Sequence, residues 1–240
     1  MHDIAYDAVH DEIVVNSPLT QAILAFRGGA DGEEPPVRVI QGPKTQILGV
    51  GAMDKVTIDP ENGDIYLATA KHNILVYPYG SNGDVAPIRE LGGPDTQIRF
   101  LEQSVGSGNT PPIRVDPIHN LLIVPSRPTG QPPALLIFDR HARGNAKPLR
   151  VIRGPKTLIA NSQQIAVSPK GYIVGGASGG SIGVWSINDN GDVPPRWKIP
   201  VRQMTGLNVN GIALNPAEKE IMVPTGNGNT VMTFYFPEIF

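Results

Sequence analysis

The chain alternates short β-type runs with turn residues, in an order of apolar and polar positions that recurs along its length. The first run of each copy alternates or is apolar, as at residues 4–6 and 56–58. A tight turn follows, and then a β-branched run such as residues 65–67. A third run closes on an aromatic residue, as at residues 74–77, and a short Arg-x-Ile run follows a proline, as at residues 37–40. Runs of this length joined by turns predict four antiparallel strands in each copy.

The copies recur at a nearly constant interval. The residues that end the first run are Asp7, Asp59, Asp116, Ser168 and Asn215, and they are spaced by 52, 57, 52 and 47 residues. No window repeats apolar residues with a helical period, so we expect almost no helix. Repeats of about 40–50 residues with four strands are typical of β-propellers, which have roughly 4–8 blades. The pattern therefore predicts an all-β, five-bladed β-propeller of four-stranded antiparallel blades.

We interpret the chain as a single β-propeller domain, residues 1–240, with approximate blades at 1–47, 48–103, 104–160, 161–207 and 208–240. The last copy lacks the Pro-x-Arg-x-Ile run, so the last blade is predicted to lack its outer strand. Either a ring closes by packing of the first blade on the fifth, or the chain is part of something longer, such as a six-bladed propeller. We prefer the closed ring, because an open stack leaves exposed terminal sheets. The bare edge of the last blade predicts a homodimer formed through that edge.

Composition excludes several classes of partner and site. The chain has 20 Lys and Arg against 22 Asp and Glu, a net charge of −2, so we expect no nucleic acid and no membrane surface as partner. Its lack of cysteine excludes disulfides, thiolate metal sites and cysteine nucleophiles. The sequence enters the repeat at once, without a basic and then apolar leader, so we expect a soluble protein without a signal peptide and leave its compartment unknown.

Short phrases around the turns are similar to those of a known group of proteins. The chain has 27 glycines and 24 prolines, which recur at the turns. In the second copy, Ile-x-Val-Tyr at residues 74–77 is followed by Gly-Asp-Val-x-Pro-x-Arg at residues 83–89 and Gly-Pro-x-Thr at residues 93–96. These phrases resemble the NHL-like repeats of bacterial, often exported β-propeller proteins. The resemblance covers almost the whole chain and implies a propeller fold and an exported bacterial protein. It implies no activity, because propellers include enzymes, receptors and scaffolds.

One face of the predicted propeller is the expected binding surface. Loops that enter the central channel share this face with the loops between second and third strands, and loops on a rigid scaffold often carry binding. Segments 97–110 and 126–133 depart from the repeat on this face, and such insertions often mark a binding face. The predicted contact residues are Lys44, Lys71, His72, Arg99, Arg127 and Asn161.

A metal site at the channel mouth is an alternative. Oxygen ligands there could converge on Ca²⁺, in a way that resembles gluconolactonase-like propellers, and the candidates are Asp3, Asp54, Gln163 and Asn210. Calcium typically takes about 6–8 oxygens, and only two of these ligands are charged, so we favour a solvated mouth without a metal.

The remaining candidate residues have structural interpretations. His10 and His119 lie in turns between first and second strands, on the opposite face, and no histidine pair has metal-ligand spacing. The glycine-rich segment 175–181 has neither an evident base nor a following helix, so it is predicted to be a hairpin turn. A residue used once in each blade is predicted to staple that blade by pairing with a carboxylate or carbonyl, and the recurring arginines are Arg38, Arg89, Arg150 and Arg196.

The function expected from the sequence is a non-catalytic scaffold for binding or protein interaction. It has no catalytic residue and no cofactor, and its partner is an unknown protein or small molecule. One alternative is a Ca²⁺-assisted, lactonase-like hydrolase with its site at the channel mouth. A second alternative is an engineered or truncated repeat protein without a ligand.

Overall fold

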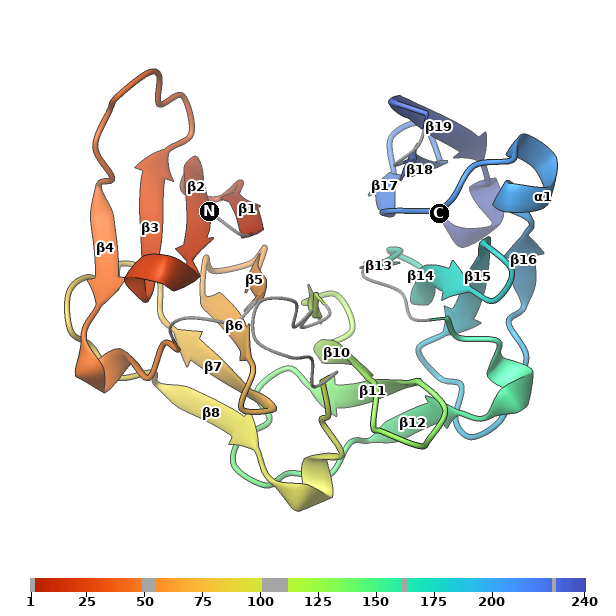
Figure 1. Cartoon of the computed structure of the whole chain (residues 1–240), viewed down its shortest axis with the longest axis horizontal. Helices are drawn as coiled ribbons and strands as arrows, with labels where there is room; N and C mark the ends of the chain where they lie inside the picture. The colour runs from red at the N-terminus through yellow and green to blue at the C-terminus, as the bar shows by residue number, and fades with distance from the viewer. Residues whose placement is uncertain (1–2, 49–54, 101–111, 161–163, 226–227) are drawn as a thin grey trace.

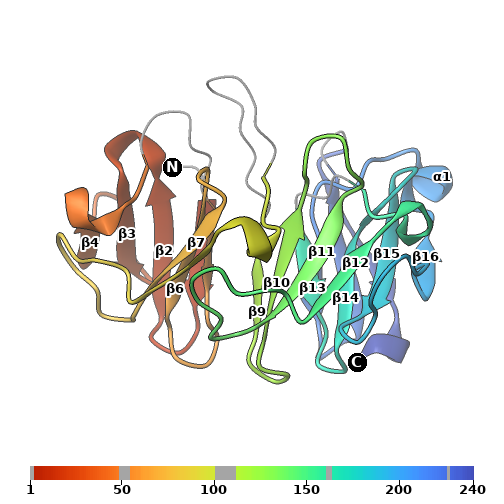
Figure 2. The same ribbon diagram turned by 90° about the horizontal axis from the view of Figure 1, so that it is seen from below.

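The protein is a five-bladed β-propeller, as the sequence predicts. The structure, a computed structural model, describes residues 3–48, 55–100, 112–160, 164–225 and 228–240. Its strands form four sheets of four strands and one of three, all antiparallel and arranged around a common axis (Figure 1). In a view from the side, α1 (Val201–Thr205) and the C-terminus lie at opposite faces (Figure 2).

Consecutive strands pair in chain order within each blade. Blade 1 contains β1 (Asp3–Asp7), β2 (Glu12–Ser17), β3 (Ala22–Arg27) and β4 (Arg38–Gln41). Blade 2 contains β5 (Lys55–Ile58), β6 (Ile65–Thr69), β7 (Asn73–Tyr77) and β8 (Arg89–Gly92). Blade 3 contains β9 (Arg114–Asp116), β10 (Leu121–Ser126), β11 (Ala134–Asp139) and β12 (Arg150–Arg153). Blade 4 contains β13 (Ile165–Val167), β14 (Tyr172–Ala177), β15 (Ser181–Ser186) and β16 (Trp197–Ile199). Blade 5 contains only β17 (Ala213–Asn215), β18 (Glu220–Thr225) and β19 (Thr230–Tyr235).

The Gly-Pro-x-Thr segments form short 3-10 helices that leave the outer strand of a blade. These are η2 (Pro43–Thr45), η3 (Pro94–Thr96) and η4 (Pro155–Thr157), while η1 (Pro18–Thr20) and η5 (Pro237–Ile239) lie elsewhere. The threonine hydroxyl donates to the carbonyl of the preceding glycine, at 2.7 Å from Thr157 Oγ1 to Gly154 O. Blade 4 lacks the Gly-Pro pair, and the five-residue α1 takes this place, with Thr205 Oγ1 donating to Val201 O at 2.7 Å. None of the helices in the described residues is long and apolar enough to cross a bilayer.

The hydrophobic core lies between blades. The described residues form four buried clusters, one at each junction of consecutive blades. The aromatic residue that closes the third strand faces the preceding blade, and Tyr77, Phe138 and Trp185 are fully buried there. Trp185 Nε1 donates to Thr157 O at 3.1 Å, and the Tyr77 hydroxyl donates to Thr45 O in the same manner. Each of these two aromatics therefore anchors the connection that arrives from the blade before it.

The Asn/Gly/Asp turn of one blade closes the outer edge of the preceding blade. Gly83 N donates to Val39 O at 2.6 Å, and Gln41 N donates to Gly83 O at 3.1 Å. Asp84 Oδ1 then accepts from Lys44 N at 2.7 Å. The same arrangement joins blade 3 to blade 2 and blade 4 to blade 3. The sequence predicted turns at these positions, and the structure shows that they also form hydrogen bonds to the preceding blade. We call each such set of hydrogen bonds between two blades a clasp.

The recurring arginines staple the blades, as predicted, and three of them also reach the next blade. Arg38 pairs with Glu12 and donates to Ser81 O at 3.3 Å. Arg89 and Arg150 likewise donate to carbonyls of the following blade. Arg196 differs, because Trp197 takes the equivalent position in the strand register, and Arg196 pairs with Asp189 of its own blade at 3.0 Å.

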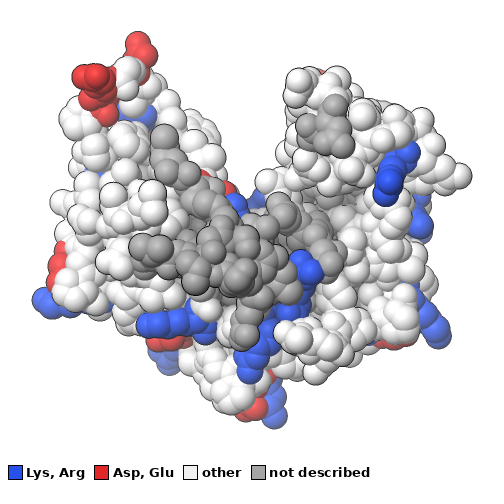
Figure 3. Space-filling view, in the orientation of Figure 1, with Lys and Arg blue, Asp and Glu red and all other residues white. Residues whose placement is uncertain are grey.

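The predicted closed ring is wrong. The described residues of the first and last blades do not form a packed interface, and Figure 3 shows an open notch between these blades. Ile4 of β1 is 66% exposed, whereas Ile165 at the same repeat position is 1% exposed. The blades pack face to face in sequence, but their successive rotations do not bring the fifth against the first. Two apolar sheet faces therefore remain uncovered.

A buried acid lies where blade 3 meets blade 2. Asp59 is fully buried, its Oδ1 accepts from Glu61 N at 3.0 Å, and Arg140 Nη1 lies 3.5 Å from the same oxygen. Burial raises the pKa of Asp59 above its ordinary value, while the Glu61 amide and Arg140 act in the opposite direction. Arg140 also pairs with Glu61, which keeps the guanidinium neutralised if Asp59 loses its charge.

Replacing Asp59 with asparagine is expected to stabilise the protein increasingly as the pH rises. A raised pKa means that the native state binds the proton more tightly than the unfolded state, so this group's contribution to stability is lost as the pH rises from about 4. The asparagine side chain would keep the acceptor for Glu61 N and lose the titration. Urea unfolding of both proteins at pH 4 and pH 7 measures the difference. A gap between the two proteins that does not change with pH would contradict this account.

Candidate functional site

The turn between β6 and β7 supports the start of the segment that leaves blade 2. His72 has a left-handed backbone with φ of 63°, and its Nδ1 accepts from Phe100 N at 3.1 Å. The two rings meet edge to face, with centroids 6.0 Å apart. Lys71, beside it, is exposed. His72 is thus held by segment 97–100, which the sequence had marked as different from the repeat, and Lys71 is its neighbour in the same turn.

The same segment is held from the other side by blade 3. Arg99 N donates to Ser126 Oγ at 3.0 Å, and Arg127 N donates to Arg99 O at 2.7 Å. Arg153 Nη1 donates to Gln97 Oε1 at 3.0 Å. The structure therefore links Arg99 with Arg127 through the backbone, places Lys71 next to His72 in the adjoining turn, and adds Arg153, which the sequence analysis did not name. We call Lys71, Arg99, Arg127 and Arg153 the cationic cluster.

The cationic cluster lacks a matching acid. Figure 3 shows Lys and Arg atoms across the second and third blades in this view. Among the described residues, no ion pair joins the cationic cluster to a carboxylate. Burial lowers the pKa of the Arg127 and Arg153 guanidinium groups, because the loss of surrounding water disfavours their charged form. Arg153 Nε is buried without a hydrogen-bond partner in this part of the structure. Such a surface is suited to an anionic group that supplies the missing contacts.

Two other predicted contact residues are not part of this cluster. Lys44 lies in η2 at the outer end of blade 1, where its backbone N–H donates to Asp84. Asn161 lies outside the described residues. The prediction placed all six residues on one surface. The structure links His72, Arg99 and Arg127 through segment 97–100, and Lys71 lies next to His72 in the chain.

The two candidate metal ligands that the structure describes, Asp3 and Asn210, lie on different blades. Asp3 of β1 accepts from Val56 N at 2.9 Å and lies 3.6 Å from Lys55 Nζ. Asn210 precedes β17 in blade 5, and its backbone N–H donates to Pro224 O at 3.2 Å. Asp54 and Gln163 lie outside the described residues. No group of three or more His, Asp or Glu within the described ranges is arranged to hold a metal ion. The calcium site stays a prediction.

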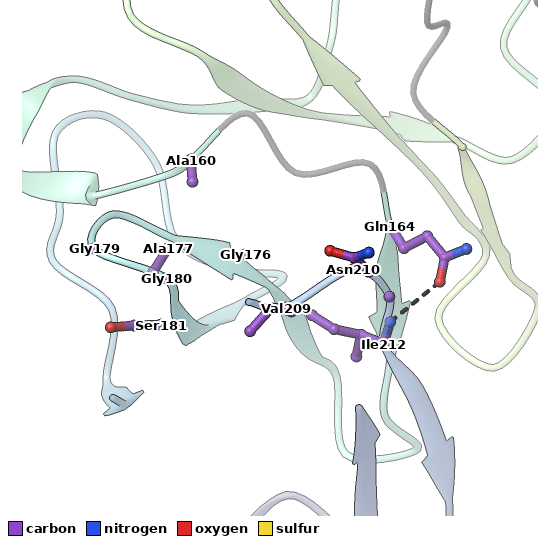
Figure 4. Close-up of a pocket in the computed structure, with 11 residues that line it drawn as sticks. Ala160, Gln164, Gly176, Ala177, Gly179, Gly180, Ser181, Val209, Asn210 and Ile212 are labelled. Carbon is purple, nitrogen blue, oxygen red and sulfur yellow. Dashed lines mark hydrogen bonds between the residues drawn. The ribbon is translucent and has the colours of Figure 1, made fainter. Parts of the chain in front are cut away.

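A pocket of about 410 Å³ lies between blades 4 and 5. Figure 4 shows the hairpin around Gly179 and Gly180 on one side and the segment at Val209 to Ile212 on the other. Gln164 Oε1 spans the two blades by accepting from Ile212 N at 3.1 Å. The described residues that line the pocket include no acid, base or thiol, so these residues offer hydrogen bonds but no group for proton transfer. The glycine-rich segment is a hairpin turn, as predicted, with φ of 77° at Gly179 and 69° at Gly180.

The turn histidines pair with the aspartates that end the first strands. His10 Nδ1 lies 2.7 Å from Asp7 Oδ2, and His119 Nδ1 lies 2.8 Å from Asp116 Oδ2. Each aspartate also accepts from the backbone N–H of its histidine, at 3.2 Å in both turns. These contacts fix the turn between first and second strands, which agrees with the structural interpretation of both histidines.

Comparison with solved structures supports the fold alone. The β-propeller domain of Myceliophteria thermophila Cps50 (Swd1) matches with a TM-score of 0.63 and 10% identity, over 98% of this chain and 68% of that one. A chain of the Mitotic Checkpoint Complex matches with a TM-score of 0.61 and 11% identity, over 97% of this chain and 60% of that one. No protein-family model and no curated protein matches the sequence. The NHL-like resemblance therefore stays a prediction.

Proposed function

We propose that this protein is a non-catalytic scaffold that binds an acidic segment of a partner protein through the cationic cluster. The observation that supports it is a set of partly buried guanidinium groups without a matching carboxylate among the described residues. Arginine side chains bind carboxylates through two parallel hydrogen bonds, and such contacts are stronger when water is excluded. The backbone contacts of Arg99 hold Arg99 and Arg127 in place before binding, which reduces the entropy lost on association.

The fold is compatible with this role. Propellers present loops on a rigid framework, and the same framework serves scaffolds and enzymes. The Mitotic Checkpoint Complex chain is, by its title, part of an assembly, and this gives modest support by analogy. Among the described residues that line the pocket between blades 4 and 5 there is no acid or base, which supports a binding role for this pocket.

A charge-reversal experiment tests the proposal with an octaglutamate peptide as probe. The double variant Lys71→Glu/Arg127→Glu is expected to bind the labelled peptide at least about tenfold more weakly than the unchanged protein, because two attractive charges become repulsive. Binding by the unchanged protein should also weaken as salt rises. Fluorescence anisotropy measures both effects.

A matched control separates the cluster from net charge. Arg143→Glu/Lys147→Glu makes the same change in charge in the exposed turn of blade 3 between β11 and β12. It is expected to leave peptide binding within about twofold of the unchanged protein, since the screening length is only about 8 Å in physiological salt. An equal loss in both double variants, or no binding by the unchanged protein, would refute the proposal.

A further inference from the structure

The outer edge of the last blade is not covered by the described part of this chain. In blades 1 to 4 the third strand pairs with a fourth, whereas the sheet of blade 5 ends at β19. After β19 the chain turns into η5, where Ile239 is fully buried against the junction of blades 4 and 5. The Glu238 carbonyl accepts from Lys170 Nζ of blade 4 at 3.4 Å. The C-terminal residues thus dock on the core and do not supply the missing strand.

The other blades show which backbone groups this edge presents. The residue before each fourth strand donates to the carbonyl of the third-strand residue that precedes the aromatic, and Val37 N to Ala25 O is 2.8 Å. The corresponding bonds in blades 2, 3 and 4 measure 2.8, 2.8 and 2.7 Å. Thr233 precedes Phe234 in β19 and occupies the Ala25 position. Its carbonyl therefore points to the open side, where a further strand would bind by the same hydrogen bonds.

Side chains at one pair of positions match each other in three of the four complete blades. The first position is at the start of the second strand, where blade 1 has Glu12. The second position is in the fourth strand, at the residue that pairs with the Ala25 position, and blade 1 has Arg38 there. Glu12 pairs with Arg38 in blade 1, and in blade 2 Asp64 lies 3.9 Å from Arg89. In blade 4 both residues are aromatic, and the rings of Tyr172 and Trp197 meet edge to face at 5.3 Å. Blade 3 has Leu121 and Arg150 at the two positions, and its arginine donates to Ile187 O of the next blade. In both blades with an acid at the first position, an arginine lies at the second.

Glu220 occupies this position in blade 5. It pairs with Asn215 in the register, as Glu12 pairs with Asp7. Neither an ion pair nor a side-chain hydrogen bond joins the Glu220 carboxylate to another of the described residues. If β19 paired with β19 of a second copy, that strand would bring no cation to the Glu220 carboxylate, because β19 contains no Lys, Arg or His. The unpaired carboxylate thus favours a strand that carries an arginine.

An exposed apolar residue of β19 indicates a second feature of the strand that would bind there. Val231 of β19 is 60% exposed, whereas the equivalent Ile74 and Ile182 are fully buried. In the complete blades, Ile74 pairs with Leu91 and Ile182 pairs with Ile199. Leu91 and Ile199 each lie two residues after the fourth-strand position that holds Arg89 or Trp197, which is the position that would lie near Glu220 in blade 5. An incoming strand with isoleucine or leucine at this place would cover part of the Val231 side chain.

We propose that β19 binds, by strand addition, an extended segment of a partner protein in which arginine is followed two residues later by isoleucine or leucine. The arginine would pair with Glu220, the aliphatic residue would pack beside Val231, and the residue before the arginine would donate its N–H to Thr233 O. A proline earlier in the segment would stop the strand from extending. This surface is separate from the cationic cluster, so the two proposals stand or fall independently.

The chain's own fourth-strand sequence provides a probe. A labelled, capped peptide with the sequence of residues 35–45, Pro-Pro-Val-Arg-Val-Ile-Gln-Gly-Pro-Lys-Thr, is expected to bind the protein saturably in fluorescence anisotropy. Replacing its arginine with glutamate should weaken binding at least about tenfold, because the peptide would then oppose Glu220 with a like charge. Glu220→Lys in the protein should weaken binding of the original peptide by a similar factor and restore binding of the glutamate peptide.

Matched controls keep the result interpretable. Glu218→Lys makes the same change in charge two residues away, at an exposed site that contacts Asn215 through its backbone N–H, and should leave peptide binding within about twofold. Thermal melting of both variants checks that they fold alike. The proposal is overturned if the unchanged protein does not bind the peptide, if Glu218→Lys and Glu220→Lys act equally, or if the charge swap restores nothing. It is also overturned if sedimentation shows a dimer that excludes the peptide, since a second copy then covers the edge.

Discussion

Replacing Ile165 with alanine is expected to lower the free energy of unfolding by about 2–5 kcal/mol. Ile165 begins β13 in blade 4, is 1% exposed, and packs in the cluster between blades 3 and 4. Alanine would remove three methyl or methylene groups and leave a cavity that the paired sheets cannot easily fill. Urea unfolding, with the same slope for both proteins, measures the loss.

The matched change at Ile4 shows whether the open notch exists in solution. Ile4 has the same repeat position as Ile165 but is 66% exposed, because no blade covers that face of blade 1. Ile4→Ala is therefore expected to change the free energy of unfolding by only about 0.5 kcal/mol or less. If both variants lose similar stability, the first blade is covered in solution, either by the fifth blade or by a second molecule. A dependence of the Ile4→Ala effect on protein concentration would identify the second case.

Replacing Gly154 with alanine is expected to cost roughly 3 kcal/mol or more. Gly154 has φ of 140° and ψ of 172°, a region that is almost restricted to glycine and costs other residues about 1–3 kcal/mol. A Cβ at this position would also lie 2.3 Å from Asp192 Cγ, whose Oδ1 accepts from Lys156 N at 2.8 Å. The side chain would therefore strain the backbone and disrupt the clasp between blades 3 and 4.

Gly191 is the control for this substitution because it belongs to the same clasp. Its φ is 81°, and an added Cβ would meet nothing within 4 Å. Gly191→Ala should therefore cost only about 1–2 kcal/mol, the ordinary penalty for a left-handed backbone. Thermal or urea unfolding of the two variants compares them directly. Equal losses would mean that the clasp adds nothing to stability beyond the backbone conformation of its glycines.

The first and last blades expose different kinds of surface at the notch. Blade 1 exposes an apolar face, with Ile4 and Tyr6 of β1 at 66% and 59% exposure. Blade 5 exposes both a face and the hydrogen-bonding edge of β19. Only the edge carries directional information, since Thr233 O and Glu220 specify the register and charge of what binds. This is why we assign a partner to the edge and none to the open face.

The cationic cluster was predicted in part. Its members Lys71, Arg99 and Arg127, and the neighbouring His72, depart from the repeat or lie in hairpin turns, and those signals identified them. Arg153 was missed because it closes an outer strand at a regular repeat position, and its contact with Gln97 comes from a segment 56 positions away. Lys44 was included because its turn lies at the expected face, but its place on blade 1 leaves it outside the cluster.

The amino-acid sequence by itself determined the strands, their order and the number of blades. Alternating apolar residues, turn glycines and prolines act over a few residues, and they specify which face of each strand is apolar. The tertiary structure decided whether those faces are covered. Closure of a ring depends on the rotation between blades summed around the axis, and this sum is a property of all the interfaces together. The clasps, the docking of Ile239 and the unpaired Glu220 likewise depend on contacts between distant segments, for which no local pattern of residues is sufficient.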